Sequence, residues 1–304
     1  MAESDPLKPE VLLAILKFAV EVSVTVFVGF KTAAIGTGEG INLPGVLSLI
    51  ALVMSSGVTL LTGYRVLMLA GGADEEEERA KKGAARVRNL RNSLTAFILL
   101  NCAFQVGYNV DGTDSESGII EQGSLIALGL AALNKIVLDP LADLGGFGKL
   151  FDVHCVEGQD RNIKRLLVFV ALGAALTMLV VDIDEKGGLP GDYSDDHVAV
   201  LGTSLGLISL HLLLLLLGMV GQQFKACKML ALGSTIKGGD CDDDKSSFHG
   251  LNEIPIVRSV VVGSVVILLS FILGEEVVAV KNAGTLAGSL ISVMIADSLG
   301  RNLV

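Results

Sequence analysis

The sequence predicts an all-α membrane protein, a polytopic bundle of about eight transmembrane helices arranged as four helix hairpins. Of the 304 residues, 51% are hydrophobic and only 18% are charged, whereas soluble domains carry roughly a quarter charged residues. The mean hydropathy is +0.63, and the apolar residues form long runs instead of alternating with polar ones. Basic residues are also divided unevenly between alternating connections, and this division predicts both termini on the cytosol-equivalent side.

Eight apolar runs meet or approach the length of about 20 residues that a transmembrane helix needs. The third run is short, while the second and sixth are long enough to tilt or to project from the membrane. The runs cover residues 11–30, 44–70, 93–110, 117–138, 164–183, 197–223, 254–274 and 283–300.

Charge sets the predicted orientation, because cytosolic connections of membrane proteins carry an excess of Lys and Arg. The termini and three long connections, together with the span ends beside them at residues 164, 165 and 258, hold 17 of the 23 basic residues, whereas the four short connections hold three. This alternation supports an even number of spans. The short connections and the span ends beside them also hold 13 acidic residues, Asp182 among them, so the outer face is predicted to be anionic and to concentrate cations. The simpler interpretation is that these connections are acidic only because they must be soluble.

The second helices of the four predicted hairpins contain similar strings, which begin at Ser48, Gly123, Gly206 and Gly288. They suggest a weak internal duplication of two four-helix halves, 1–150 and 151–304, within one membrane domain. Leu-rich segments also match by chance, so both origins of the similarity stay open.

Ionisable groups inside spans are costly and are therefore functional candidates. Lys17 and Glu21 in the first span are four residues apart and share a helix face. We expect them to form an intramembrane ion pair, either as a structural clamp between helices or as part of an ion or proton path.

Other polar residues lie within the third, sixth and eighth spans. Asn101 and Gln105 share one face and suit hydrogen bonds between helices. His211 could relay protons or donate one hydrogen bond to a neighbouring helix, and Asp297 is an isolated acid about one turn from the inner end. Together with Glu21, three of them (Asn101, His211 and Asp297) could line one polar cavity.

Three further basic residues, Arg65, Lys135 and Arg258, lie near the inner ends of spans. We expect their side chains to extend to the lipid headgroups and assign them no chemistry.

Small residues at fourth positions let two helix backbones approach closely. Two such patterns, Gly202 with Gly206 and Gly284 with Gly288, lie at the outer ends of the sixth and eighth spans. They favour packing within the chain, although a contact between copies would use the same pattern.

No motif predicts a reaction. The sequence has no P-loop, dinucleotide fingerprint, HExxH or GxSxG, and its four cysteines show no CxxC spacing. We therefore expect no enzymatic activity, no cofactor, no metal site and no nucleic-acid partner.

Two functions remain. The first is a channel or transporter for a cation or small solute, supported by the anionic outer face and the intramembrane polar residues. The second is a structural or assembly protein, or an accessory subunit of a larger membrane complex, supported by the absence of any specific motif. Either one predicts a multi-pass protein in contact with the lipid bilayer, in a homo-oligomer or a membrane complex. The sequence does not identify the membrane.

Overall fold

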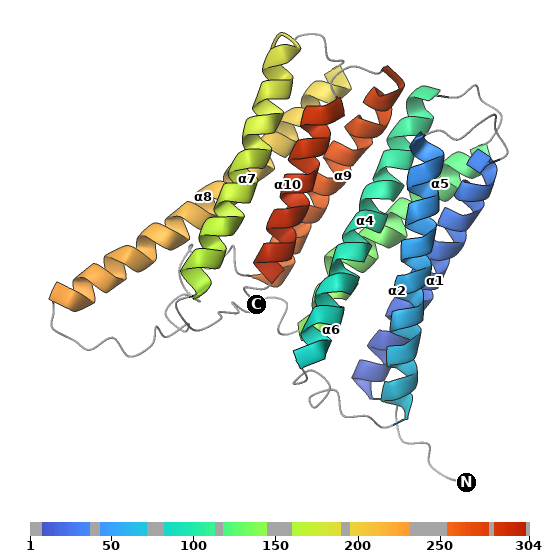
Figure 1. Ribbon diagram of the computed structural model, residues 1–304, viewed down its shortest axis with the longest axis horizontal. Coiled ribbons are helices and arrows are strands. Elements are labelled where there is room, and N and C mark those ends of the chain that lie inside the picture. The colour runs from blue at the N-terminus through green and yellow to red at the C-terminus, as the bar shows by residue number, and fades with distance from the viewer. Residues whose placement is uncertain are drawn as a thin grey trace. The chain divides into compact units, whose positions relative to one another are not determined.

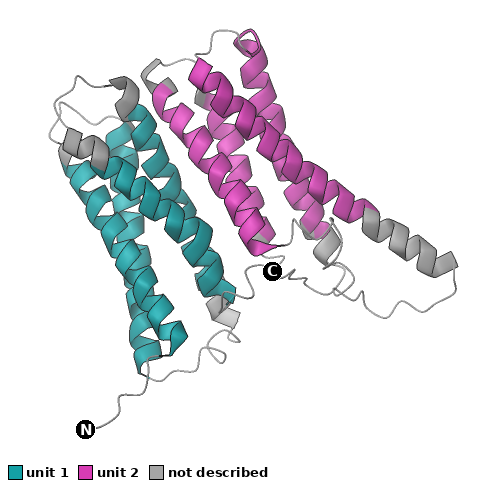
Figure 2. Ribbon diagram, turned by 180° about the vertical axis from the view of Figure 1, so that it is seen from behind, with its two compact units in different colours: residues 1–147 teal, residues 148–304 magenta. Residues whose placement is uncertain are grey.

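The computed structural model divides the chain into two compact units, Met1–Phe147 and Gly148–Val304 (Figure 2). It describes residues 8–36, 43–71, 82–112, 118–144, 160–189, 195–231, 254–279 and 283–301. These residues form helices and short turns without any β-strand, which confirms the all-α class. Each unit is described by itself below.

Six helices are long and apolar enough to cross a membrane. In unit 1 they are α1 (Pro9–Gly36), α2 (Leu43–Ala70) and one continuous helix built from α5 (Gly118–Ala132), a π-helical turn η1 (Leu133–Leu138) and α6 (Asp139–Leu144). In unit 2 they are α7 (Asp160–Glu185), α8 (Asp195–Ala231) and α9 (Pro255–Ala279).

Two more helices complete the units, α4 (Lys82–Gly112) in unit 1 and α10 (Ala283–Arg301) in unit 2. The first has three arginines in its first ten residues (Arg86, Arg88 and Arg91), and the apolar part of the second is only the short segment Gly284–Gly300. The chain is thus a helical multi-pass membrane protein.

Each unit is a ring of four helices. In unit 1, α1 packs on α2, α2 on α4, α4 on α5 and α5 back on α1 (Figure 1). In unit 2, α7 packs on α8, α8 on α9, α9 on α10 and α10 back on α7. The most extensive contact is between the first two helices in unit 1 but between the first and last helices in unit 2.

Large apolar side chains point away from each ring. In unit 1, Phe30, Leu60 and Leu67 are 72%, 75% and 73% exposed. Exposing such residues to water would be unfavourable, whereas hydrocarbon solvates them. The outward faces of the helices are therefore surfaces for lipid.

The π-helical turn η1 changes which side chains share a face. The N–H of Asp139 donates to the carbonyl of Asn134, five residues earlier. In an α-helix these two residues would point about 140° apart, because each residue advances the helix by about 100°. The widened turn aligns them instead. Pro140 follows at once, and its missing N–H and bulky ring disfavour a regular α-helical turn here.

Candidate functional site

The site begins with Lys17 and Glu21 on α1. Lys17 is 1% exposed, Glu21 is 3% exposed, and Lys17 Nζ lies 3.4 Å from Glu21 Oε1, so the ion pair predicted from their spacing is present. Glu21 lies about 18 Å from the start of α1, a helix about 42 Å long. The pair therefore lies near the middle of the span, where water is least available.

Lys17 makes its other two contacts with η1 and α6. Its ammonium donates to Asn134 Oδ1 at 3.1 Å and to Asp139 Oδ1. An ammonium has three N–H donors, so Lys17 has three acceptors for three donors. The π-helical turn makes this arrangement possible, because it aligns Asn134 with Asp139.

The helix α4 completes the network with donors to the two carboxylates of α6. Thr95 donates to Asp139 Oδ2 at 2.5 Å. Arg91 and Asn92 donate to the two oxygens of Asp143 at 2.7 and 2.6 Å. Each of these carboxylates therefore accepts hydrogen bonds at both of its oxygens.

The carboxylate of Glu21 is less well satisfied than the other two. Its Oε1 has the Lys17 ammonium at 3.4 Å and the amide of Asn134 at 3.5 Å, both longer than a normal hydrogen bond. Its Oε2 accepts no hydrogen bond from the described residues. The Thr62 hydroxyl of α2 lies beside this carboxyl and is oriented to act on it as a weak donor, although the two do not meet the distance and angle of a hydrogen bond.

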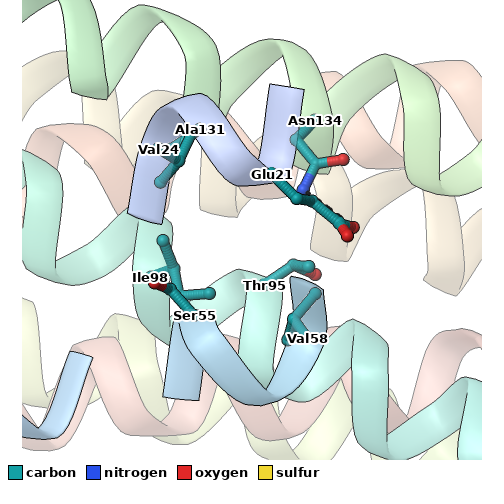
Figure 3. A pocket seen from close by; sticks show the side chains of 8 residues that line it. All are labelled: Glu21, Val24, Ser55, Val58, Thr95, Ile98, Ala131 and Asn134. Atoms are coloured by element: carbon teal, nitrogen blue, oxygen red, sulfur yellow. Dashed lines mark hydrogen bonds between the residues drawn. The ribbon is translucent and has the colours of Figure 1, made fainter. Parts of the chain in front are cut away.

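Glu21 lies at a small cavity where all four helices of unit 1 meet. Figure 3 shows Glu21 and Asn134 side by side, with Thr95 and Val58 facing them. The cavity offers about 10 Å³ to the centre of a water molecule, which is room for about one water. Its lining residues are Glu21, Val24, Ser55, Val58, Thr95, Ile98, Ala131 and Asn134.

This arrangement is suited to accepting a small positive charge. When ionised, the three acidic side chains of the network, Glu21, Asp139 and Asp143, are matched in number by Lys17, Arg91 and Lys135, but the contacts of Glu21 Oε1 are long, at 3.4 and 3.5 Å. A buried charge without full compensation is expensive in a membrane interior. A proton, or a small cation at the cavity, would compensate it at Glu21.

The other two candidates in unit 1 lie on α4 away from this cavity. Asn101 and Gln105 are both buried, and neither belongs to the cavity lining. Gln105 Nε2 donates to the carbonyl of Pro44 at 3.0 Å, so it joins α4 to the start of α2.

The remaining two candidates lie together in unit 2. His211 on α8 is buried and interacts electrostatically with Arg258 of α9 and Asp297 of α10. Arg258 donates to the carbonyl of Gly300. The structure thus pairs His211 with Asp297 in one unit, and Glu21 lies in the other.

The four glycines of the small-residue patterns differ in their surroundings. A Cβ at Gly288 would lie 2.6 Å from Met178 Sδ, so α10 approaches α7 closely at this point. A Cβ at Gly202, Gly206 or Gly284 would meet no atom within 4 Å among the described residues.

Several charged residues lie deeper than the sequence suggested. Lys135 and Arg258 do not extend toward headgroups: both are buried, Lys135 donates to the carbonyl of Asn92 at 2.7 Å, and Arg258 reaches Gly300. The assignment of Asp182 to the anionic outer face was also wrong, because it is fully buried and accepts from Thr285 at 2.6 Å. In each case a backbone or hydroxyl partner on a neighbouring helix replaces solvent.

The sequence interpretation missed Asn134 and Asp139. The span was predicted to end at residue 138, so Asp139 was counted in a connection, and Asn134 was not singled out. The available signal was the pair Asp139-Pro140 at the end of an apolar run, together with Asn134 five residues earlier.

Comparison of the chain with protein-family models, curated proteins and solved structures found no match. Function is therefore inferred from the residues and their geometry.

Proposed function

We propose that the chain is an eight-span membrane protein that transports a small cation, or a small solute together with one, and that Glu21 is its cation-binding group. The proposal assigns no catalytic step. The observation that carries it is the partly unsatisfied carboxylate of Glu21 at a water-sized cavity inside unit 1. Buried ionisable groups in membrane helices are expensive and typically mark ion or proton pathways.

Eight spans follow if α4 and α10 also cross the membrane. The apolar part of α10, Gly284–Gly300, is about 25 Å long, a few ångströms short of a typical hydrocarbon core. Local thinning of the bilayer accommodates such a mismatch at a modest cost. An even number of spans also agrees with the alternation of basic residues between connections.

Exposed acidic side chains at one end of unit 2 support the choice of a cation. They lie at the end of α7 and the start of α8, and they are Asp184, Glu185, Asp195 and Asp196. Such a cluster concentrates cations at the surface, and this effect weakens as ionic strength rises.

A flux assay on purified protein in liposomes tests the proposal. Protons, Na⁺ and K⁺ are driven one at a time across the bilayer by a concentration gradient, with empty liposomes as the baseline. We expect flux of one cation in the wild type and at least a tenfold loss in Glu21→Gln, an isosteric change that removes the charge. Asp182→Asn in unit 2 is the matched control, because it neutralises another buried carboxylate, and it should retain flux.

The alternative function is a structural or accessory subunit of a membrane complex. It is favoured by buried polar groups that only join helices, such as Gln105 to Pro44 and Ser289 to the carbonyl of Ala175 at 2.9 Å. Folded wild-type protein that carries none of the cations above the baseline of empty liposomes would reject transport and support this function. The variant His211→Ala tests whether unit 2 contributes to transport, because a loss of flux in this variant would show that it does.

A further inference from the structure

Resting on the proposed function, we infer that the transported cation is a proton and that Glu21 carries it as a neutral carboxylic acid facing the central cavity of unit 1. The proton passes from a hydronium ion to Glu21 Oε2, so that one O–H bond of hydronium breaks, one O–H bond forms on the carboxylate, and a water molecule is left behind. Release to a water molecule on the other side is the reverse step. No other reactant is needed.

Among the three carboxylates of the network, Glu21 is the one suited to take the proton. Asp143 accepts from Arg91 and Asn92, and Asp139 accepts from Thr95 and Lys17. Hydrogen bonds from such donors stabilise the ionised form of a carboxyl. Glu21 has only long contacts at Oε1 and no donor bonded to Oε2 among the described residues. Its ionised form is the least stabilised.

The neighbouring oxygen atoms do not form a cage for a metal cation. Besides Glu21, the polar side chains that line the cavity are those of Ser55, Thr95 and Asn134, and Asn134 Oδ1 already accepts from the Lys17 ammonium. The cavity holds about one water, whereas hard cations bind through several oxygen ligands. Of the side chains that line the cavity, Glu21 alone is charged, so a metal cation there would have one strong ligand and the site favours a proton.

The charges around Glu21 also oppose the binding of a metal cation beside the Lys17 ammonium. Lys17 of α1 and Arg91 of α4 face it with positive charge, and Asp139 of α6 faces it with negative charge. The helix α2 contributes hydroxyls, from Thr62 and from Ser55 in the cavity lining. A metal ion at Oε2 would lie close to the Lys17 ammonium, which is 3.4 Å from the other oxygen of the same carboxylate. A proton neutralises the carboxylate without adding a separate charge.

Infrared difference spectroscopy tests this inference on the full chain in liposomes. The spectrum is recorded between alkaline and acid buffer, and the carbonyl band of a protonated buried carboxylic acid is followed. We expect the wild type to gain this band on acidification, with uptake of about one proton per chain at this site. Glu21→Gln should lose the band, and Asp182→Asn should keep it.

Sodium and potassium supply a test that needs no variant. At a fixed pH at which the wild-type band is present, adding NaCl or KCl should leave its intensity unchanged relative to an impermeant organic cation at equal ionic strength. Loss of the band on adding either salt would show that a metal ion displaces the proton and would overturn the inference. Absence of the band in the folded wild type, or its persistence in Glu21→Gln, would overturn it as well.

Failure of the inference is distinguishable from failure of the proposed function. Flux of a cation without the Glu21 band leaves transport in place and rejects the proton at Glu21. A titrating Glu21 band in protein that shows no flux leaves the proton site in place and rejects transport.

Discussion

The two units are both rings of four helices, but they use buried polar residues differently. In unit 1, Lys17, Glu21 and Asp139 form one group at a shared depth, with a cavity beside it. In unit 2, the contacts of α10 with α7 are separate pairs along the helices, such as Thr285 with Asp182 and Ser289 with Ala175.

The difference separates buried polar groups that only join two helices from a buried group of charges whose contacts are shared. A separate pair satisfies one donor and one acceptor, so its loss is local. In the Lys17 group one ammonium serves three acceptors, so the balance of the group changes when any member changes its charge. In unit 1 a change of charge at one member therefore alters the contacts of the others, whereas the described contacts of α10 with α7 in unit 2 are separate from one another.

The largest expected effect follows from removing the shared cation. Lys17→Met should destabilise unit 1 by about 3–5 kcal/mol, because it leaves two buried carboxylates without their common partner. Hydrogen exchange resolved by peptide, on protein in detergent micelles, should show faster exchange in α1 and α4 and little change in unit 2.

Lys8→Met is the control, since Lys8 is exposed just before α1 and its replacement should change stability by less than about 0.5 kcal/mol. Equal destabilisation of both units by Lys17→Met would contradict the claim that the Lys17 group stabilises unit 1 alone.

The next largest effect tests unit 2. Asp182→Ala leaves the Thr285 hydroxyl without its acceptor and should cost about 1–3 kcal/mol, measured by unfolding in mixed micelles. Thr285→Val should cost less, because Asp182 retains its contact with Lys186, whose Nζ lies 3.8 Å from Oδ2. A double variant no worse than Asp182→Ala would identify one local pair. Loss of the α1 network in either variant would refute the independence of the units.

The sequence predicts the positions of the helices well, because lipid imposes a minimum length and a continuous apolar composition. It also predicts that Lys17 and Glu21 share a helix face, because four residues are close to one α-helical turn. The pair is indeed in contact. Both inferences depend only on local geometry. The duplication of the two halves stays a prediction.

The partners of Lys17 could not be predicted in the same way. Asp139 was placed outside the membrane because the apolar run ends before it, and its orientation beside Asn134 depends on the π-helical turn. A hydropathy profile reflects amino-acid composition and does not reveal that a helix widens into a π-helical turn. The inward direction of Lys135 depends on its hydrogen bond to the Asn92 carbonyl on another helix, and a contact between two helices cannot be read from the sequence of either helix alone.

The smallest expected effect compares two glycines of unit 2. Gly206→Ala should stabilise the protein by up to about 1 kcal/mol, because alanine is the better helix former and a Cβ there meets no described atom within 4 Å. Gly288→Ala should fall short of that gain by about 1 kcal/mol, because its Cβ must displace the end of Met178.

The stabilities of the two variants are compared by unfolding in mixed micelles, and each is also measured in combination with Met178→Ala. Adding Met178→Ala should bring the effect of Gly288→Ala close to that of Gly206→Ala, since it removes the obstructing sulfur. Equal gains in both glycine variants without that change would show that the contact between α7 and α10 is looser than described. Destabilisation by Gly206→Ala would instead show that α8 has a neighbour at this point beyond the described residues, because none of these lies close enough to oppose the added methyl group.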